Sequence, residues 1–218
     1  VTIGRIFKDK LFSTRFLSGH SGTGIGSATN RCQVLSGAGQ RRVVRDPDLS
    51  GFSQADKDLL LGGSQASPNP GAHAAHRHAP DVEDDALKLR AEEGYAPDGS
   101  RGGSNNNPSI PPASTKFKDV AAMEMALNHV RPGGAGTPFD VAKNAKLATD
   151  PNTLSFPVTH DFGIEMGSGY FHPSISGNVP KGNLPLSGVI PTGPLTKIRA
   201  FYRRSTPTSN DWYLVTMY

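Results

Sequence analysis

The chain has 218 residues, including 25 glycines and 18 prolines, which together make up about a fifth of the sequence. Both residue types interrupt helices, so the composition disfavours long helices and coiled coils, and loops must hold much of the length. No apolar run approaches the roughly 18 to 20 residues of a membrane span, and Cys32 is the single cysteine, which excludes an intrachain disulfide. The composition therefore indicates a loop-rich domain with a modest core.

The charge balance is mildly basic. Lysine and arginine total 23 against 19 acidic residues, a net charge of +4. This balance permits RNA, DNA or an acidic protein as a partner and selects none of them. The chain starts at Val1 without a methionine or a signal-peptide pattern, so we expect a piece of a longer protein.

The first predicted helix covers about residues 53–61. Before it, residues 18–27 are rich in glycine but lack the lysine of a phosphate-binding loop, so a linker is the better interpretation. Ser53 is placed to cap the helix, and Gly62-Gly63 ends it. The Ser, Pro, Asn and Gly residues that follow predict a domain boundary near residue 65.

A second helix is predicted over about 82–93. Asp81 is its expected N-cap and Gly94 its expected end. The low-complexity stretch 96–113 predicts a mobile loop.

The third predicted helix covers 114–130 and has the clearest periodicity. Ser114 is its expected N-cap, and Pro132 follows its end. Apolar residues recur along it at steps of three and four, at Phe117, Val120, Met123, Leu127 and Val130.

From about residue 156 the pattern changes to short β-like runs between turns. Residues 196–204 and 211–218 predict a hairpin, and the order of elements predicts an α+β fold with helices packed on a twisted antiparallel sheet. Strict alternation along the last strand puts Thr216 and Tyr218 on one face, together with Trp212 and Leu214.

Three of the seven histidines cluster within six residues, at His73, His76 and His78. Imidazoles bind zinc readily, so a zinc-dependent hydrolase is one hypothesis, with Asp81 nearby. A solvated histidine-rich loop is the plain alternative. Acid–base catalysis is the third, because histidine titrates near neutral pH. The other four histidines are isolated in the sequence.

The order of several short motifs carries a resemblance. The chain runs Gly71-x-His73-x4-His78, Leu87-Lys88-Leu89-Arg90, Ala113-Ser114-Thr115-Lys116-Phe117, Gly167-Ser168-Gly169 and Thr216-Met217-Tyr218. This series resembles the bacterial RNase A-like toxin family, which are C-terminal toxin domains of contact-dependent inhibition proteins and related polymorphic toxins. The resemblance covers about 70–218, so we expect a nuclease domain over 66–218, after a linker over 1–65 that assists import into the target cell.

The resemblance implies a metal-independent ribonuclease without a cofactor, with an RNase A-like fold lacking disulfides. Its catalytic residues fall on His78, Arg90, Thr216 and Tyr218, and RNA contacts are expected from His73, Lys116, Arg199 and Arg203. The sequence departs from the family pattern in three ways: Ala72 replaces a glycine, Ala79-Pro80 replaces a valine, and the chain stops before a final proline. None of these changes removes a catalytic group.

The family's reaction is attack of the ribose 2′-OH on the adjacent phosphorus, leaving a 2′,3′-cyclic phosphate. The expected substrate is tRNA or another structured RNA. The resemblance further implies a cognate immunity protein as a partner, no stable membrane insertion, export within a larger cell-surface protein, and action in the cytoplasm of the target bacterium. A non-enzymatic adhesin or binding module remains an alternative.

This interpretation makes one geometric demand. In one continuous helix, His78 and Arg90 would lie about 18 Å apart and could not share a phosphate. We therefore expect the chain to break near Pro80.

Overall fold

The computed structural model describes residues 31–35, 41–62, 71–104, 107–184 and 188–218. All strand pairs among them are antiparallel, and helices and strands follow one another in separate groups along the chain, so the α+β class is confirmed. The described helices are α1 (Gln54–Leu60), α2 (Ala74–His78), α3 (Asp84–Glu93), α4 (Val120–Val130), α5 (Pro138–Thr149) and the short 3₁₀ helix η1 (Lys181–Asn183). The described strands are β1 (Arg31–Leu35), β2 (Arg41–Arg45), β3 (Gly103–Ser104), β4 (Asn107–Ile110), β5 (Ala113–Phe117), β6 (Ser155–Asp161), β7 (Gly167–Phe171), β8 (Val179–Pro180), β9 (Ile190–Pro191), β10 (Lys197–Arg203) and β11 (Tyr213–Met217).

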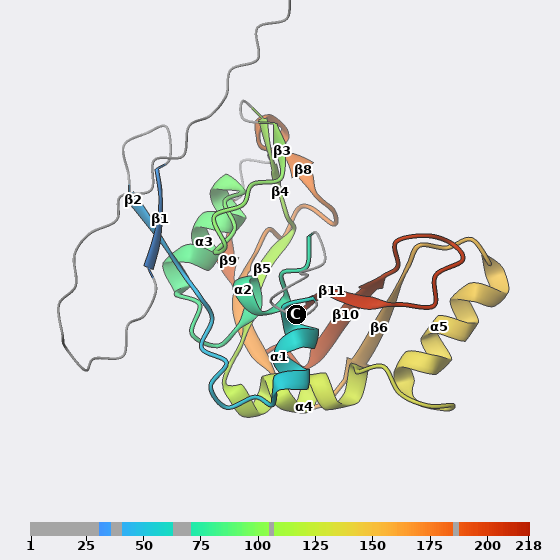
Figure 1. The fold of residues 1–218 in the computed structure, drawn as a ribbon. Helices are drawn as coiled ribbons and strands as arrows, with labels where there is room; N and C mark the ends of the chain where they lie inside the picture. Colours follow the sequence, from blue (N-terminus) through green and yellow to red (C-terminus); the bar gives the residue numbers. More distant parts are fainter. Residues whose placement is uncertain (1–30, 36–40, 63–70, 105–106, 185–187) are drawn as a thin grey trace, which may run out of the picture.

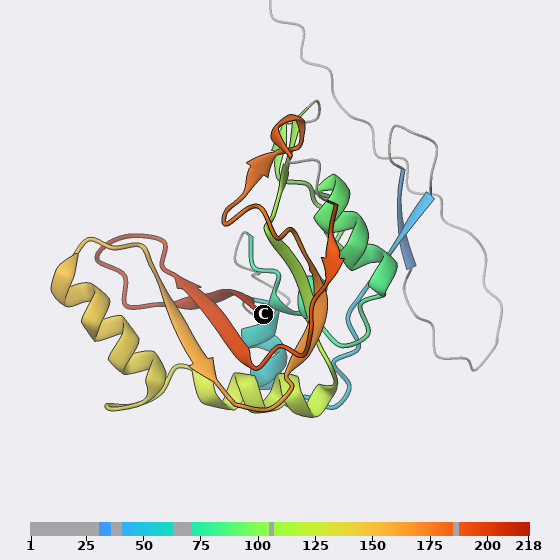
Figure 2. The ribbon, with the colours of Figure 1, turned by 180° about the vertical axis from the view of Figure 1, so that it is seen from behind.

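Three small sheets form the body of the domain. Their strand orders are β11-β10-β6, β5-β7-β9 and β3-β4-β8, and β1 pairs with β2 separately. The first sheet and α5 form one arm, and the other two sheets with α3 form a second arm (Figure 1, Figure 2). The C-terminus lies where the arms meet, beside α1 (Figure 1). Within the described residues, no helix is long and apolar enough to cross a membrane.

The core lies against one face of the β11-β10-β6 sheet. Tyr202 of β10 is fully buried there, and its hydroxyl donates to the Val130 carbonyl at the end of α4 (2.8 Å). The ring of Phe139 from α5 packs edge-on against both Phe156 and Tyr202. These contacts fix the sheet that carries the C-terminal strand.

The same core includes residues that precede the expected boundary at residue 65. Leu49, Phe52 and Leu60 are all buried in it. Ser53 caps α1 as predicted, since its side chain accepts from the Asp56 amide. Residues 49–60 are therefore part of the folded domain, and the import role of 1–65 stays a prediction.

The predicted helix over 114–130 is wrong in its first part. Residues Ala113–Phe117 form β5, paired with β7, and α4 begins only after Asp119. Asp119 is the true cap, because its carboxylate accepts from the Ala122 amide (2.7 Å). Ser114, the expected cap, is fully buried in the strand.

The predicted loop over 96–113 is also wrong in part. Strands β3 and β4 lie within it, β4 pairs with β8, and Ile110 is fully buried. Helix α5 was not predicted, although Thr137 caps it and Pro138 stands at its first turn, a common start for a helix.

Helix α3 agrees with prediction at its C-terminal end. Gly94 has φ +74 and occupies the left-handed position that ends many helices. Its N-cap position is Glu83, two residues after the predicted Asp81.

Candidate active site

The chain breaks between α2 and α3, as the catalytic hypothesis requires. Helix α2 ends at His78, Ala79 is extended with ψ 154, and the Val82 amide donates to the Ala79 carbonyl across a turn (3.1 Å). Helix α3 then starts at Asp84. The turn directs α3 back, so that the charge of Arg90 acts on the His78 ring.

His78 is held in one tautomer by the neighbouring sheet. Its side chain is buried, and its Nδ1 lies 2.7 Å from the Thr115 carbonyl in β5. A carbonyl only accepts hydrogen bonds, so Nδ1 carries the proton and Nε2 of the neutral ring has a free lone pair. Nε2 is buried and has no hydrogen-bond partner among the described residues.

The surroundings keep His78 neutral. Burial lowers its pKa well below the ordinary value, and the positive charge of Arg90 lowers it further, whereas the hydrogen bond to Thr115 acts in the opposite direction. The ring is therefore a neutral base at physiological pH.

Arg90 lies on α3 and acts electrostatically on His78. One of its guanidinium nitrogens, Nη1, is buried without a hydrogen-bond partner in the described part of the chain. Burial, and then the charge of Arg77, lower the pKa of Arg90 to about 10. Arg90 is still protonated at neutral pH, so it offers a positive donor to an anion.

A bulge in the C-terminal hairpin changes which residues of β11 share a face of the sheet, so the predicted alternation is wrong in part. Leu214 pairs with Tyr202 but Thr216 pairs with Phe201, so Val215 is the extra residue. Because of this shift, Leu214 shares the core face with Met217, and both are fully buried. Thr216 and Tyr218 still share a face, as predicted, but it is the opposite face from Leu214.

The bulge also brings Thr216 and Tyr218 to the site. The ring centroids of Tyr218 and His78 lie 5.3 Å apart. The Thr216 hydroxyl oxygen is buried and has no hydrogen-bond partner in the described regions. The structure thus places Tyr218 beside His78, with Arg90 near enough for its charge to lower the pKa of His78. Thr216 adds an unpartnered polar atom, within the described regions, on the strand that leads to Tyr218.

His73 lies at the edge of this group. Its ring centroid is 6.4 Å from that of His78, and its Nδ1 lies 2.6 Å from the Gly71 carbonyl. Burial, and then the charge of Arg77, lower its pKa to about 4. Its backbone amide donates to the carbonyl of the bulge residue Val215 (2.8 Å), which ties the start of α2 to β11.

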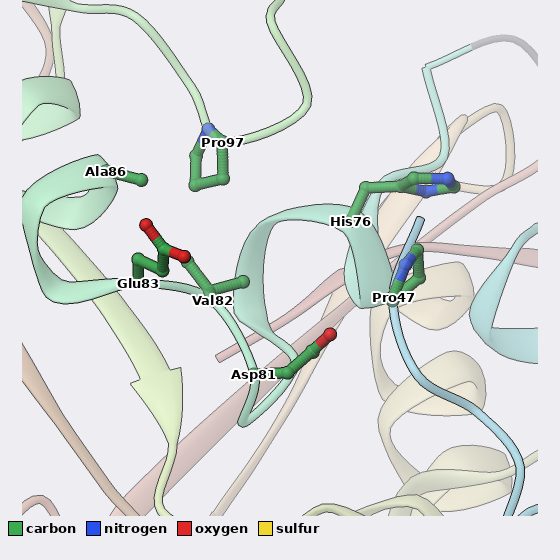
Figure 3. A pocket seen from close by; sticks show the side chains of 7 residues that line it. All are labelled: Pro47, His76, Asp81, Val82, Glu83, Ala86 and Pro97. Atoms are coloured by element: carbon green, nitrogen blue, oxygen red, sulfur yellow. The ribbon is translucent and has the colours of Figure 1, made fainter. Parts of the chain in front are cut away.

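The three clustered histidines do not converge on one point. His76 lines a separate pocket of about 300 Å³ with Asp81 and Glu83 (Figure 3). Nδ1 of His73 and Nδ1 of His78 are each engaged with a carbonyl. Over the described ranges, no group of three or more His, Cys, Asp or Glu side chains is arranged to hold a metal ion.

The four residues expected to bind RNA have different surroundings. Arg199 and Arg203 are exposed on the outer face of β10, and His73 lies beside the site. Lys116 is instead engaged in structure, with its ammonium 2.8 Å from an Asp84 carboxylate oxygen and 2.7 Å from the Val82 carbonyl. It joins β5 to the start of α3.

Two glycines in β7 allow β7 and β5 to lie unusually close together. A side chain on Gly167 would collide with the Lys116 carbonyl, and one on Gly169 with the Ser114 carbonyl. The Gly-Ser-Gly motif therefore has a packing role: it lets β7 lie close against the strand that orients His78.

Other supporting residues were not apparent in the sequence. Arg77 is fixed by Asp98 (2.7 Å) and Ser100 (2.6 Å). Buried His172 lies with its Nε2 2.7 Å from the Ala91 carbonyl, one residue after Arg90. No local signal marks these contacts, because each joins segments distant in sequence.

Comparisons of the chain with family models, curated proteins and solved structures find no match.

Proposed function

We propose that this domain is a metal-independent endoribonuclease toxin with an RNase A-like fold held without disulfides. One observation carries the proposal: His78, Arg90 and Thr216 each have a buried polar side-chain atom without a partner in the described structure. Buried polar atoms are nearly always hydrogen-bonded. The neutral imidazole of His78, the guanidinium of Arg90 and the hydroxyl of Thr216 are groups that could bind an RNA phosphodiester through these unpartnered atoms.

The reaction follows from the protonation states. Nε2 of His78 accepts the proton of the ribose 2′-OH, and the 2′-oxygen forms a bond to phosphorus. The guanidinium of Arg90 stabilises the negative charge that develops on the phosphoryl oxygens. The bond from phosphorus to the 5′-oxygen breaks, and this oxygen takes up a proton, for which the Tyr218 hydroxyl is the proposed donor. The products are a 2′,3′-cyclic phosphate and a 5′-hydroxyl, and DNA is excluded because it lacks the nucleophile.

The biological setting is proposed from the ordered sequence motifs. The domain is delivered as part of a larger exported surface protein and cuts tRNA or another structured RNA in the cytoplasm of a competing bacterium. A producer of such a nuclease needs a cognate immunity protein, and an acidic face on that protein would match this basic domain.

The test is incubation of the protein with total RNA in EDTA, followed by mapping of 3′ ends. Fragments ending in cyclic phosphate are expected from the wild type. They are expected to be lost in His78→Gln and kept in His76→Gln, the matched control on the same helix. Intact RNA at high protein concentration would contradict the proposal and favour a binding module. Cleavage abolished by EDTA and restored by zinc would favour the hydrolase.

A further inference from the structure

One face of the β11-β10-β6 sheet carries exposed side chains and is not covered by the core in the part of the chain that the structure describes. Along β10, Ile198, Ala200 and Tyr202 are buried in the core, whereas the alternate residues face outward. Strand register gives the outward residues as rows across the three strands. We call this the open sheet face: Thr159-Arg199-Tyr218, Pro157-Phe201-Thr216 and Ser155-Arg203-Tyr213.

The open sheet face is positively charged. Arg199 and Arg203 are exposed, and neither is within ion-pair distance of a carboxylate in the described residues. Beyond the Arg199 row, Lys197 lies 3.8 Å from Asp161, and both side chains are largely exposed. The two unpaired guanidiniums favour an anionic ligand that extends along the strand.

Aromatic rings lie between and beside these charges. Phe201 is half-buried and sits between Pro157 and Thr216 in the middle row. Tyr213 lies opposite Arg203 in the third row. Alternate residues on a strand are about 6.7 Å apart, so a cation, a ring and a second cation follow one another over about 13 Å of β10.

The open sheet face leads into the candidate active site. Tyr218 belongs to its first row, and the Tyr218 ring contacts His78. The start of α3 is acidic instead, with Asp81, Glu83, Asp84 and Asp85 all exposed, of which Asp84 is paired with Lys116. Beyond Arg90, a polyanion therefore meets exposed carboxylates at the start of α3 and exposed guanidiniums along β10.

We propose that an unpaired segment of RNA lies across the open sheet face, with bases stacked on Phe201 and Tyr213 and phosphates bound by Arg199 and Arg203. Stacking on protein rings needs bases that are not already paired and stacked in a helix, whereas duplex RNA is bound through phosphates and 2′-hydroxyls. The preferred target in a structured RNA is then a loop or an end. This inference rests on the proposed function and specifies its substrate.

The test compares two uncleavable probes by fluorescence anisotropy. One is a 2′-O-methyl oligonucleotide of mixed sequence, about 12 nucleotides long, and the other is the same strand annealed to its complement. The wild type is expected to bind the unpaired probe at least about tenfold more tightly. Phe201→Leu keeps apolar volume and loses the ring, so the affinity for the unpaired probe is expected to fall about 5- to 100-fold while duplex binding changes little. Phe201→Tyr is expected to retain the affinity.

Charge is tested separately. Arg203→Gln is expected to weaken the binding of both probes. It is also expected to reduce the slope of log affinity against log salt concentration by about 0.7 for the unpaired strand. The control Lys88→Gln, an exposed lysine on α3, is expected to leave the slope unchanged. Equal binding of the unpaired probe by the wild type and Phe201→Leu, or tighter binding of the duplex, would overturn the proposal.

The outcomes separate this inference from the proposed function. If the wild type cleaves RNA to cyclic phosphates but Phe201→Leu binds the unpaired probe as tightly as the wild type, the open sheet face does not bind RNA as proposed, and the ribonuclease proposal is unaffected. If the probes behave as expected but RNA stays intact, the face binds RNA and the catalytic assignment is wrong.

Discussion

The ring of His78 lies 5.3 Å from the ring of Tyr218, although α2 and β11 are far apart in sequence. The amide of His73 donates a hydrogen bond to the carbonyl of the bulge residue Val215, which ties the start of α2 to β11 beside this contact. The irregularity in the hairpin is therefore part of the geometry of the site.

The first prediction concerns the base. Replacing His78 with glutamine leaves a side chain that can donate to Thr115 but cannot accept a proton, so we expect RNA cleavage to fall at least about 10²-fold. Timed cleavage of a labelled RNA measures the rate. A folded His78→Gln protein that cleaves at the wild-type rate would exclude His78 as the base.

The second prediction is a pH profile. As the proposed base, His78 must be unprotonated to act, and its pKa lies well below the ordinary histidine value because the ring is buried. We therefore expect kcat/KM to stay level as pH falls through 6.5 and to decline only in more acidic solution. A decline centred near pH 6.5 or above would indicate a different base.

The third prediction couples Arg90 to that profile. Arg90→Gln removes charge stabilisation of the transition state, which is expected to cost about 10²- to 10³-fold in kcat. It also removes a positive charge that lowers the pKa of His78, so the acid limb of the residual activity is expected to move to higher pH. An unchanged limb would place Arg90 away from His78.

The fourth prediction concerns stability in acid. His73 and His78 are neutral in the folded protein, with pKa values below the ordinary 6.5, and burial is the main cause. The unfolded chain binds protons on both residues first, so the free energy of unfolding should be constant above about pH 6.5 and fall as pH drops toward about 4. Urea titrations at several pH values measure this, and His73→Asn should flatten the dependence. A stability that rises over this range would contradict the burial of these rings.

The fifth prediction concerns the glycine motif. Gly169→Ala forces a methyl group against the Ser114 carbonyl, which must displace β5 and with it the carbonyl that orients His78. We expect a loss of at least about 2 kcal/mol of stability, together with lower activity. Gly177→Ala is the control: an added Cβ there meets nothing within 4 Å, and a change within about 0.5 kcal/mol is expected.

Local signals in the sequence predicted the elements that local interactions determine. Ser53 capping α1, Gly94 ending α3 and the C-terminal hairpin are features of this kind. The apolar spacing over 114–130 was misleading, because Phe117 fits both a helical stripe and the buried side of a strand paired with β7.

Residue type and order in the sequence indicate which residues could form the candidate site, whereas their geometry could not be predicted. The Val215 bulge, the Thr115 carbonyl and the contact between His172 and α3 depend on pairings between distant segments. Alternation alone placed Leu214 beside Thr216, and only strand register shows that the bulge separates them.

Among the described strands, β11 pairs only with β10 and is thus an edge strand of its sheet. It carries Thr216 and Tyr218, and its bulge anchors the helix that ends in His78. The same strand fills the core with Leu214 and Met217, which are both fully buried. Under the proposed function, any loosening of this edge strand would therefore lower the stability of the domain and its ribonuclease activity together.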